Sequence, residues 1–180
     1  MDTISANQQL DNFLDLQWQR MMQNYPEYAS YLRMANDAMN SRWTDSSLSS
    51  IYQRHEQIRA ALAALHAIDR SKLSDAQKTN YDLMQWQLEM EIDEFQYKTY
   101  LIPLDQSDGV QTLDDFANFV PLNTLKDYEN WLARLSALPS LLEQTRTLME
   151  AGIAAKVMPS ADTMARVPAQ LKRHVVEEPT

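Results

Sequence analysis

The sequence predicts an all-α fold, an irregular bundle of about six to eight helices with one long central helix. Glycine occurs only at positions 109 and 152, whereas strand-rich folds use glycine freely in hairpin turns and bulges. Alanine, leucine, glutamine, glutamate and methionine dominate instead, and these residues favour helices. Apolar residues also recur along the chain at the i, i+3, i+4 spacing of a helix with one buried face.

The first third of the chain divides into helices at a proline and at a polar stretch. The spacing predicts a helix over about residues 7–24. Pro26 stops this helix and can begin a short second one directly after it. Residues 36–45 are polar and turn-like, and a long helix is predicted over about residues 47–69.

The longest helix is expected over about residues 75–100. Ser74 and Gln77 have the spacing of a capping box at its start, and Pro103 ends it. Apolar side chains lie on two of its sides, the first formed by Met84, Leu88 and Phe95 and the second by Leu83, Trp86, Met90 and Tyr97. A helix that is apolar on two sides usually has neighbours on both, so we expect it at the centre of the fold.

The middle of the chain begins with a polar loop over residues 105–112. A short helix is predicted after it, reaching about Val120. Thr124 and Asp127 have the spacing of a cap for the helix that follows. The buried stripe expected on this helix is Leu125, Tyr128, Trp131, Leu132, Leu135 and Leu138.

Two further helices complete the predicted fold. Pro139 suits the first turn of a helix that continues to about Lys156. Ser160 is the expected cap of a last helix that reaches about Val175, and Pro168 would kink or split this helix.

Length, charge and composition limit the classes of function. The 180 residues fit one helical domain over residues 1–180, and 44% of them are hydrophobic, which is enough for a core. The 16 basic and 25 acidic side chains give a net charge of −9, so we expect no binding to nucleic acid or to anionic lipid. Without cysteine the chain has no disulfide and no thiol site.

The sequence predicts no membrane span. The longest apolar stretch, residues 60–65, is far shorter than the roughly 18 residues that a span needs. The chain opens on Met1-Asp2-Thr3, which lacks the basic start of a signal peptide.

The three histidines do not have the spacing of a zinc site. His55 begins the zincin pattern His-Glu-x-x-His, but Arg59 stands where the second ligand is required. His66 follows His55 by eleven residues, so the two lie roughly 16 Å apart along one helix face and cannot bind one metal. His174 and Glu177 have an acceptable helical spacing, but they are only two ligands and lie near the chain end.

Other candidate sites have a simpler explanation as ordinary structure. An acidic cluster of Glu89, Glu91, Asp93 and Glu94 could serve acid–base or di-metal chemistry. No Glu-x-x-His accompanies it, so a solvated or ion-paired helix face is expected. The loop over residues 105–111 is rich in oxygen ligands but lacks the length and terminal glutamate of a calcium-binding EF-hand, so a turn is favoured.

The remaining composition adds no catalytic motif. The chain has no Gly-x-Ser-x-Gly nucleophile motif and no glycine-rich phosphate loop. Its ten methionines and sixteen aromatic residues are expected mainly in the core, with a minority on an interface or pocket wall. The sequence therefore predicts no catalytic, cofactor-binding or metal-binding residue within this chain.

Several segments, in order along the chain, carry a family resemblance. They are Tyr25–Leu32 (YPEYASYL), Arg42–Ser47 (RWTDSS), Ile68–Leu73 (IDRSKL), Asn80–Leu83 (NYDL), Pro103–Gln111 (PLDQSDGVQ), Ala133–Pro139 (ARLSALP) and Met149–Ile153 (MEAGI). Together they resemble the N-terminal part of the bacterial domain-of-unknown-function family 885. One departure from the family pattern is Lys156, which stands where a small residue is expected.

The resemblance implies a context for this chain. Members of that family are much longer and look like zincins, with a His-Glu-x-x-Pro-Gly-His motif well beyond the region that matches here. The resemblance therefore implies a zinc metallopeptidase-like parent in which this segment forms a wall beside the catalytic cleft. It also implies a periplasmic or lipoprotein-anchored location. No residue here matches the family's zinc ligands or base, so no site residue carries over.

Three hypotheses follow. The first is an N-terminal helical segment of a zinc metallopeptidase-like protein, inactive alone, whose partners are the rest of its polypeptide and, in the parent, peptides. The second is a self-contained helical binding or scaffold domain without enzymatic activity. The third, a metal-binding bundle enzyme, is opposed by the number and spacing of the histidines. If the first is right, apolar surface that faces the rest of the protein should be exposed in this chain.

Overall fold

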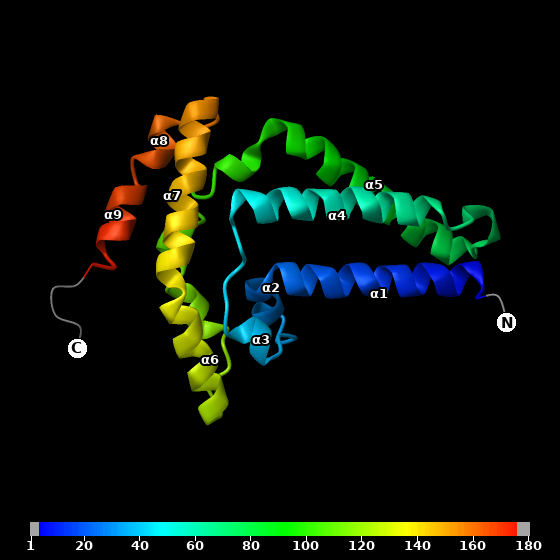
Figure 1. The fold of residues 1–180 in the computed structure, drawn as a ribbon, viewed down its shortest axis with the longest axis horizontal. Coiled ribbons are helices and arrows are strands. Elements are labelled where there is room, and N and C mark those ends of the chain that lie inside the picture. Colours follow the sequence, from blue (N-terminus) through cyan, green and yellow to red (C-terminus); the bar gives the residue numbers. More distant parts are fainter. Residues whose placement is uncertain (1–3, 176–180) are drawn as a thin grey trace.

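The computed structural model describes residues 4–175, and every regular element in this range is helical (Figure 1). The helical share is 72%, which confirms the predicted all-α class. Of the nine α-helical segments in this range, seven exceed four residues in length, within the expected number. The segments are α1 (Ala6–Asn24), α2 (Pro26–Tyr31), α3 (Asp37–Asn40), α4 (Leu48–His66), α5 (Asp75–Glu94), α6 (Leu125–Ser136), α7 (Leu138–Ala155), α8 (Ala161–Met164) and α9 (Val167–Lys172).

Helices α1, α4 and α5 form one half of the molecule, in which α4 runs antiparallel to the other two (Figure 1). Their facing side chains follow the predicted helical spacing and meet in a buried cluster. The cluster consists of Leu10, Phe13, Ala61, Leu65, Ile68, Leu73, Tyr81 and Leu88. Burying each large apolar side chain contributes roughly 1.5–3 kcal/mol, so this cluster is the main reason that the three helices associate.

Serine side chains begin each of these three helices. Ser5, Ser47 and Ser74 each accept a hydrogen bond from the backbone N–H three residues later, which stabilises a helix start by about 1 kcal/mol. The predicted cap at Ser74 is confirmed, but only half of the predicted capping box forms. The side chain of Gln77 donates to Asp11 of α1 and not to the backbone of Ser74.

Helix α5 ends at Glu94, earlier than predicted. Two short 3-10 turns, Phe95–Tyr97 and Thr99–Leu101, follow it and are separated by Lys98, whose φ of 55° is left-handed. This reversal brings Tyr100 back over Phe95, with the two rings stacked at 4.9 Å between centroids. The chain therefore leaves the α-helix well before Pro103, and the stacked rings pack the reversed segment against the helix end.

One side of α5 is not covered, contrary to the expectation for a helix that is apolar on two sides. Leu88 is buried, and Met84 packs against the same cluster. The other side is open to solvent, and Trp86 has an exposed fraction of 61%. No other element in the described part of the chain packs on that side.

Helices α2, α3 and α6 are held together by a buried arginine. Arg134 of α6 is fully buried and donates to the hydroxyl of Ser30 and to the backbone oxygen of Met39. Its guanidinium carbon lies 5.3 Å from the ring centroid of Trp43 and 4.9 Å from that of Phe116. Burial lowers the pKa of Arg134 to about 10, because the charged form loses water contacts that these partners only partly replace.

Helices α6 and α7 follow each other almost without interruption and form a bent helix of 31 residues. The two helices are separated by a turn at Ala137, and Pro139 lies in the first turn of α7, as the sequence predicts. The Thr124–Asp127 capping box at the start of α6 is also confirmed. Together the two helices run across the ends of α1 and α4 (Figure 1).

The predicted buried stripe of α6 is wrong at four of its six positions, whose apolar side chains face solvent, whereas Trp131 and Leu138 are half-buried. Leu125 and Leu132 have exposed fractions of 77% and 62%, and Tyr128 and Leu135 are also exposed. The buried residues of α6 are polar instead, Asn130 and Arg134. The helix therefore packs on α2 and α3 through hydrogen bonds. Trp131 adds aromatic contacts to Trp43 and Phe116, each at 6.3 Å between ring centroids, while the exposed apolar side chains of α6 lie open to solvent.

The last predicted helix is split into α8 and α9, with the break at residues 165–166 and Pro168 in the first turn of α9, and it ends at Lys172, before the predicted Val175. Helix α9 lies against the loop before α6, where Gln170 Nε2 donates to the backbone oxygen of Gln106 over 2.8 Å. The short helix predicted to reach Val120 consists of 3-10 turns, Val110–Thr112 and Asp115–Asn118. None of the helices in the described range combines the length and the apolar character that a membrane crossing requires.

Candidate functional site

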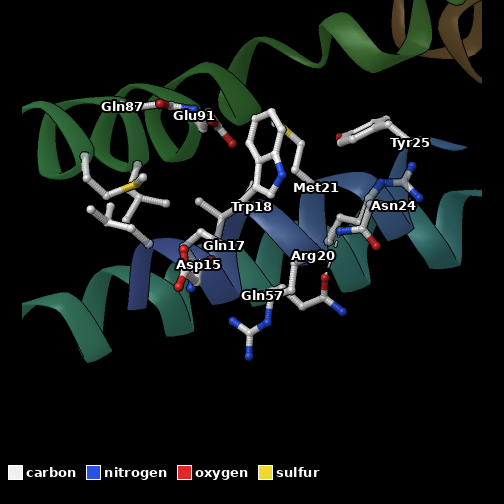
Figure 2. Close-up of a pocket in the computed structure, with 15 residues that line it drawn as sticks. Asp15, Gln17, Trp18, Arg20, Met21, Asn24, Tyr25, Gln57, Gln87 and Glu91 are labelled. Carbon is white, nitrogen blue, oxygen red and sulfur yellow. Dashed lines mark hydrogen bonds between the residues drawn. The ribbon is translucent and has the colours of Figure 1, made fainter. Parts of the chain in front are cut away.

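A groove of about 730 Å³ lies between α1, α4 and α5. Helices α1 and α5 form its walls and α4 its floor. Figure 2 shows Trp18 and Met21 extending from α1 toward α5, where Gln87 and Glu91 lie. The lining residues are Leu14, Asp15, Gln17, Trp18, Arg20, Met21, Asn24 and Tyr25 from the α1 side, Arg54, Gln57 and Ile58 from α4, and Met84, Gln87, Leu88 and Glu91 from α5.

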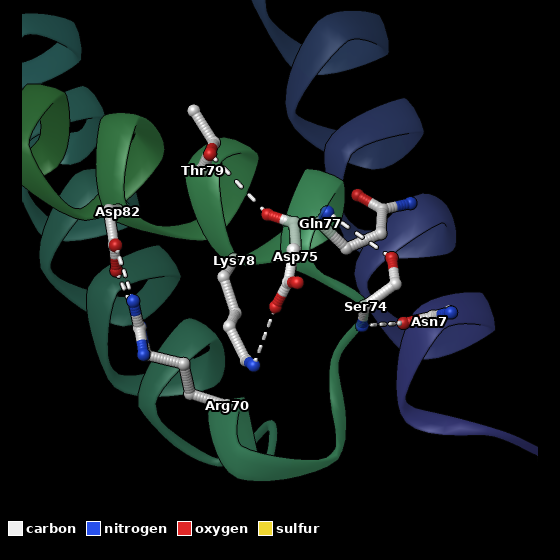
Figure 3. Close-up of polar contacts among 8 residues, drawn as sticks. All are labelled: Asn7, Arg70, Ser74, Asp75, Gln77, Lys78, Thr79 and Asp82. Carbon is white, nitrogen blue, oxygen red and sulfur yellow. Dashed lines mark hydrogen bonds and ion pairs between the residues drawn. The ribbon is translucent and has the colours of Figure 1, made fainter.

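The groove exists because α1 and α5 are tied together at one end only. At that end, the backbone N–H of Ser74 donates to Asn7 of α1 over 3.1 Å (Figure 3). Nearby, Arg70 forms a two-pronged ion pair with Asp82, with both N···O distances 2.6 Å (Figure 3). Toward the other end the two helices separate, and side chains of α4 are left open between them.

The groove combines apolar walls with amide side chains. Trp18 has an exposed fraction of 40%, although the spacing of Leu10, Phe13, Leu14, Trp18 and Met21 is that of one apolar helix face, which predicts burial. Asn24 donates to Gln57 across the groove over 3.2 Å, and Gln87 donates to Glu91 over 2.9 Å. The Nε2 group of Gln17 has no hydrogen-bond partner among the described residues. Such a lining suits a ligand that has both apolar and amide groups.

Arg54, one of two arginines that line the groove, is held in place by a backbone oxygen and an aromatic ring. Arg54 Nη1 donates to the backbone oxygen of Asp45 over 2.7 Å, and its guanidinium carbon lies 5.7 Å from the ring centroid of Tyr25. Within residues 4–175 its guanidinium forms no ion pair. The carboxylate of Asp45 is engaged by Ser50 and Ser47, whose hydrogen bonds lower its pKa.

A smaller hollow of about 220 Å³ continues the groove past Arg54. His55 stacks on Phe95 there, with 3.8 Å between ring centroids. The hydroxyl of Tyr100 lies 3.3 Å from that of Tyr52. Burial, followed by this hydrogen bond, raises the pKa of Tyr100 to about 12. One side of this hollow is therefore aromatic, and Arg54, Glu91 and Glu94 also line it.

The structure does not bring the histidines and acidic residues of the sequence together. His55 lies in the smaller hollow, His66 is exposed at the end of α4, and His174 Nε2 lies 2.8 Å from the backbone oxygen of Gln111. Glu177 lies outside the described residues. Within residues 4–175, no three His, Cys, Asp or Glu side chains are placed to hold a metal ion. These residues therefore do not fit the zinc that the family resemblance implies.

The acidic cluster divides between the groove and the surface. Glu89, Asp93 and Glu94 are exposed, and Glu91 is half-buried. Glu89 accepts a hydrogen bond from Gln85, one helical turn before it. The expected solvated face therefore describes three of the four residues, although Glu91 and Glu94 also line the hollows.

The loop over residues 105–111 is a turn closed on itself. The carboxylate of Asp105 accepts from the backbone N–H groups of Ser107 and Asp108. Buried Gln111 donates to the backbone oxygens of Asp105 and Asp108. Gly109 has a φ of 131°, and a Cβ there would lie 2.4 Å from Cβ of Leu104. The oxygen ligands of this loop are thus used within the turn.

The sequence contained a weak signal for the groove. Ile51, Arg54 and Ile58 share one face of α4, and an arginine within an apolar stripe is unusual unless it binds a partner. Trp18 and Met21 gave no such signal, because they fit the apolar stripe of α1. Only the separation of α1 from α5 shows that these side chains line a groove.

Comparison with known proteins places the chain in a family. Residues 26–180 match the family described as "Bacterial protein of unknown function (DUF885)". The chain belongs to this family. The match covers α2 to α9 and begins after α1, so α1, which forms one wall of the groove, lies before the matched region. A search of the curated proteins found no match.

Proposed function

We propose that this chain is the helical, peptide-binding part of a zinc metallopeptidase-like protein and that it has no active site of its own. The observation that carries the proposal is the groove between α1, α4 and α5. Membership of the family supports it, together with the resemblance of the family to zincins. In this proposal, the zinc ligands and the general base come from parts of the parent protein outside these residues.

The chemistry of the groove suits a peptide. A peptide presents apolar side chains together with amide donors and acceptors at regular intervals, and the groove presents Trp18 and Met21 together with amides such as Gln17. A volume of about 730 Å³ is within the range of about 300–1,000 Å³ that is typical of ligand sites. The groove is open at its wide end, so an extended chain could continue beyond it.

Peptide binding can be tested directly on the 180-residue chain. A panel of unstructured octapeptides would be titrated by calorimetry and by tryptophan fluorescence. Trp18→Ala should weaken binding by about tenfold or more, because a large aromatic side chain in a groove carries much of a binding energy. Trp86→Ala is the matched control, since Trp86 lies outside the groove on α5, and it should leave the affinity unchanged. If no octapeptide binds, the proposal fails.

The peptidase context needs the natively expressed protein. We expect an intact mass well above 20.8 kDa, about one bound zinc, and peptide hydrolysis that a chelator abolishes. Peptide binding without zinc or hydrolysis in the native protein would leave a self-contained binding domain. Hydrolysis that a chelator does not affect would contradict the zinc mechanism.

A further inference from the structure

Arg54 is placed to recognise one particular group of a peptide. Its side chain lines both the large groove and the smaller hollow, so it stands where the two meet. It is half-buried. A guanidinium in this position presents several N–H donors in one plane, which matches the two oxygens of a carboxylate.

The guanidinium is fixed before any ligand arrives. The hydrogen bond to the backbone oxygen of Asp45 and the ring of Tyr25 hold it in one orientation. Among the arginines of the described range, Arg70 and Arg146 form ion pairs, whereas Arg54 and Arg20, the two arginines of the groove, form none. What distinguishes Arg54 is its fixed orientation, because binding need not order a mobile side chain.

The surroundings of Arg54 select among anions. Glu91 lines both hollows and Glu94 lines the smaller one, so a multiply charged anion such as phosphate would be repelled. Ile51, Ile58 and Phe95 also line the smaller hollow and offer an apolar surface beside the guanidinium. The best ligand is therefore a single carboxylate next to an apolar side chain.

We propose that Arg54 binds a peptide carboxylate in the groove, either the free C-terminus or an acidic side chain, with an apolar side chain beside it in the smaller hollow. This inference rests on the proposed peptide-binding function and makes it specific. The chemistry of the two sources is the same, so the experiment separates them.

The test uses three short peptides on the 180-residue chain. They are acetyl-Ala-Ala-Ala-Leu with a free carboxylate, the same peptide with a C-terminal amide, and acetyl-Ala-Glu-Ala-Leu with a C-terminal amide. We expect at least one carboxylate peptide to bind about tenfold more tightly than the neutral peptide, the size expected for a hydrogen-bonded charge pair. The tighter of the two identifies the source.

Variants of α4 show whether Arg54 is responsible. Arg54→Gln should abolish the preference for the carboxylate, so that all three peptides bind like the neutral one. Arg59→Gln is the matched control, since Arg59 lies on the same helix, is exposed and lines neither hollow, and it should keep the preference. Arg54→Lys retains the positive charge but lacks the planar set of N–H donors, so it should retain part of the preference for the carboxylate. If Arg54→Gln fails to fold, Arg54→Lys provides the test in its place, and an unchanged preference in that variant would overturn the role of the planar guanidinium.

The outcomes separate the two proposals. If all three peptides bind equally to the unchanged chain, the groove binds peptides but the carboxylate inference is overturned. If inorganic phosphate competes as well as a carboxylate peptide, selection by Glu91 and Glu94 is overturned. If these three peptides and the octapeptide panel all fail to bind, the proposed function falls and this inference falls with it.

Discussion

Buried polar residues decide how the second half of this molecule is assembled. Arg134 is fully buried yet contacts no carboxylate of the described residues at ion-pair distance. Its charge is balanced by backbone and hydroxyl oxygens and by the faces of Trp43 and Phe116. The indole N–H of Trp43 donates in turn to the backbone oxygen of Arg134 over 2.7 Å. These contacts join α3 and α6, which are far apart in the sequence.

Arg134→Ala should therefore destabilise the fold strongly. The change removes a large buried side chain and leaves the oxygens of Ser30 and Met39 with fewer donors. Cavity formation and lost hydrogen bonds together should lower the free energy of unfolding by roughly 3–5 kcal/mol. Urea unfolding followed by circular dichroism would measure this. An unchanged unfolding midpoint would show that the buried guanidinium is not what joins these helices.

The exposed arginine of α7 provides the control for this experiment. Arg146 pairs with Glu143 and Glu150 on the same helix, and it joins no second element. Pairs of this kind on a helix surface contribute little to stability. Arg146→Ala should leave the unfolding midpoint almost unchanged.

At the scale of the elements, helix ends account for most of the agreement between prediction and structure. The caps at Ser74, Thr124 and Ser160 were recognisable because a cap depends on one side chain and the next three residues. The C-terminal end of α7 departs from this pattern. Lys156 has a φ of 59° at a position where helices commonly end on glycine. The family pattern led us to expect a small residue at this position, and the left-handed backbone conformation is the physical reason for that expectation.

Lys156→Gly should stabilise the protein. Glycine adopts the left-handed conformation without the strain of roughly 1–2 kcal/mol that a side chain imposes, although it also gives the unfolded chain more freedom. We expect a net gain of roughly 0.5–1 kcal/mol in the free energy of unfolding. Ala154→Gly, inside the last turn of the same helix, should cost about as much. A loss of stability in Lys156→Gly would mean that the lysine side chain makes a contact worth more than the strain.

At the scale of the whole molecule, apolar surface is left uncovered on two helices. The exposed side of α5 includes Leu83, Trp86 and Met90, and Tyr97 is exposed in the turn that follows. The exposed side of α6 includes Leu125, Tyr128, Leu132 and Leu135. Monomeric proteins seldom expose continuous apolar patches of this kind. This agrees with the expectation that surface facing other parts of a larger protein is exposed here.

The exposed stripe of α6 should make the chain associate. We expect hydrophobic-dye binding and a scattering mass that rises with protein concentration. Leu132→Glu should reduce both without lowering the melting temperature, because Leu132 makes few contacts within the fold. Ala133→Glu adds the same charge to an exposed position beside the stripe and should have a smaller effect. A strict monomer that binds no dye would contradict this prediction.

The sequence by itself determined the helices of this protein and most of their ends. Helical spacing, caps and prolines act within a few residues, so the predicted segments over residues 7–24 and 47–69 correspond closely to α1 and α4. The tertiary structure alone decided which side of each helix is covered. The stripe of α6 has the same helical spacing as the stripe of α1, but only that of α1 meets other helices and becomes core. The groove was also decided by the tertiary structure, because it depends on the separation of α1 from α5. The sequence does not show that Arg54 lines this space. The spacing of apolar residues shows which side of a helix is apolar, whereas the burial of that side depends on which other elements pack against it.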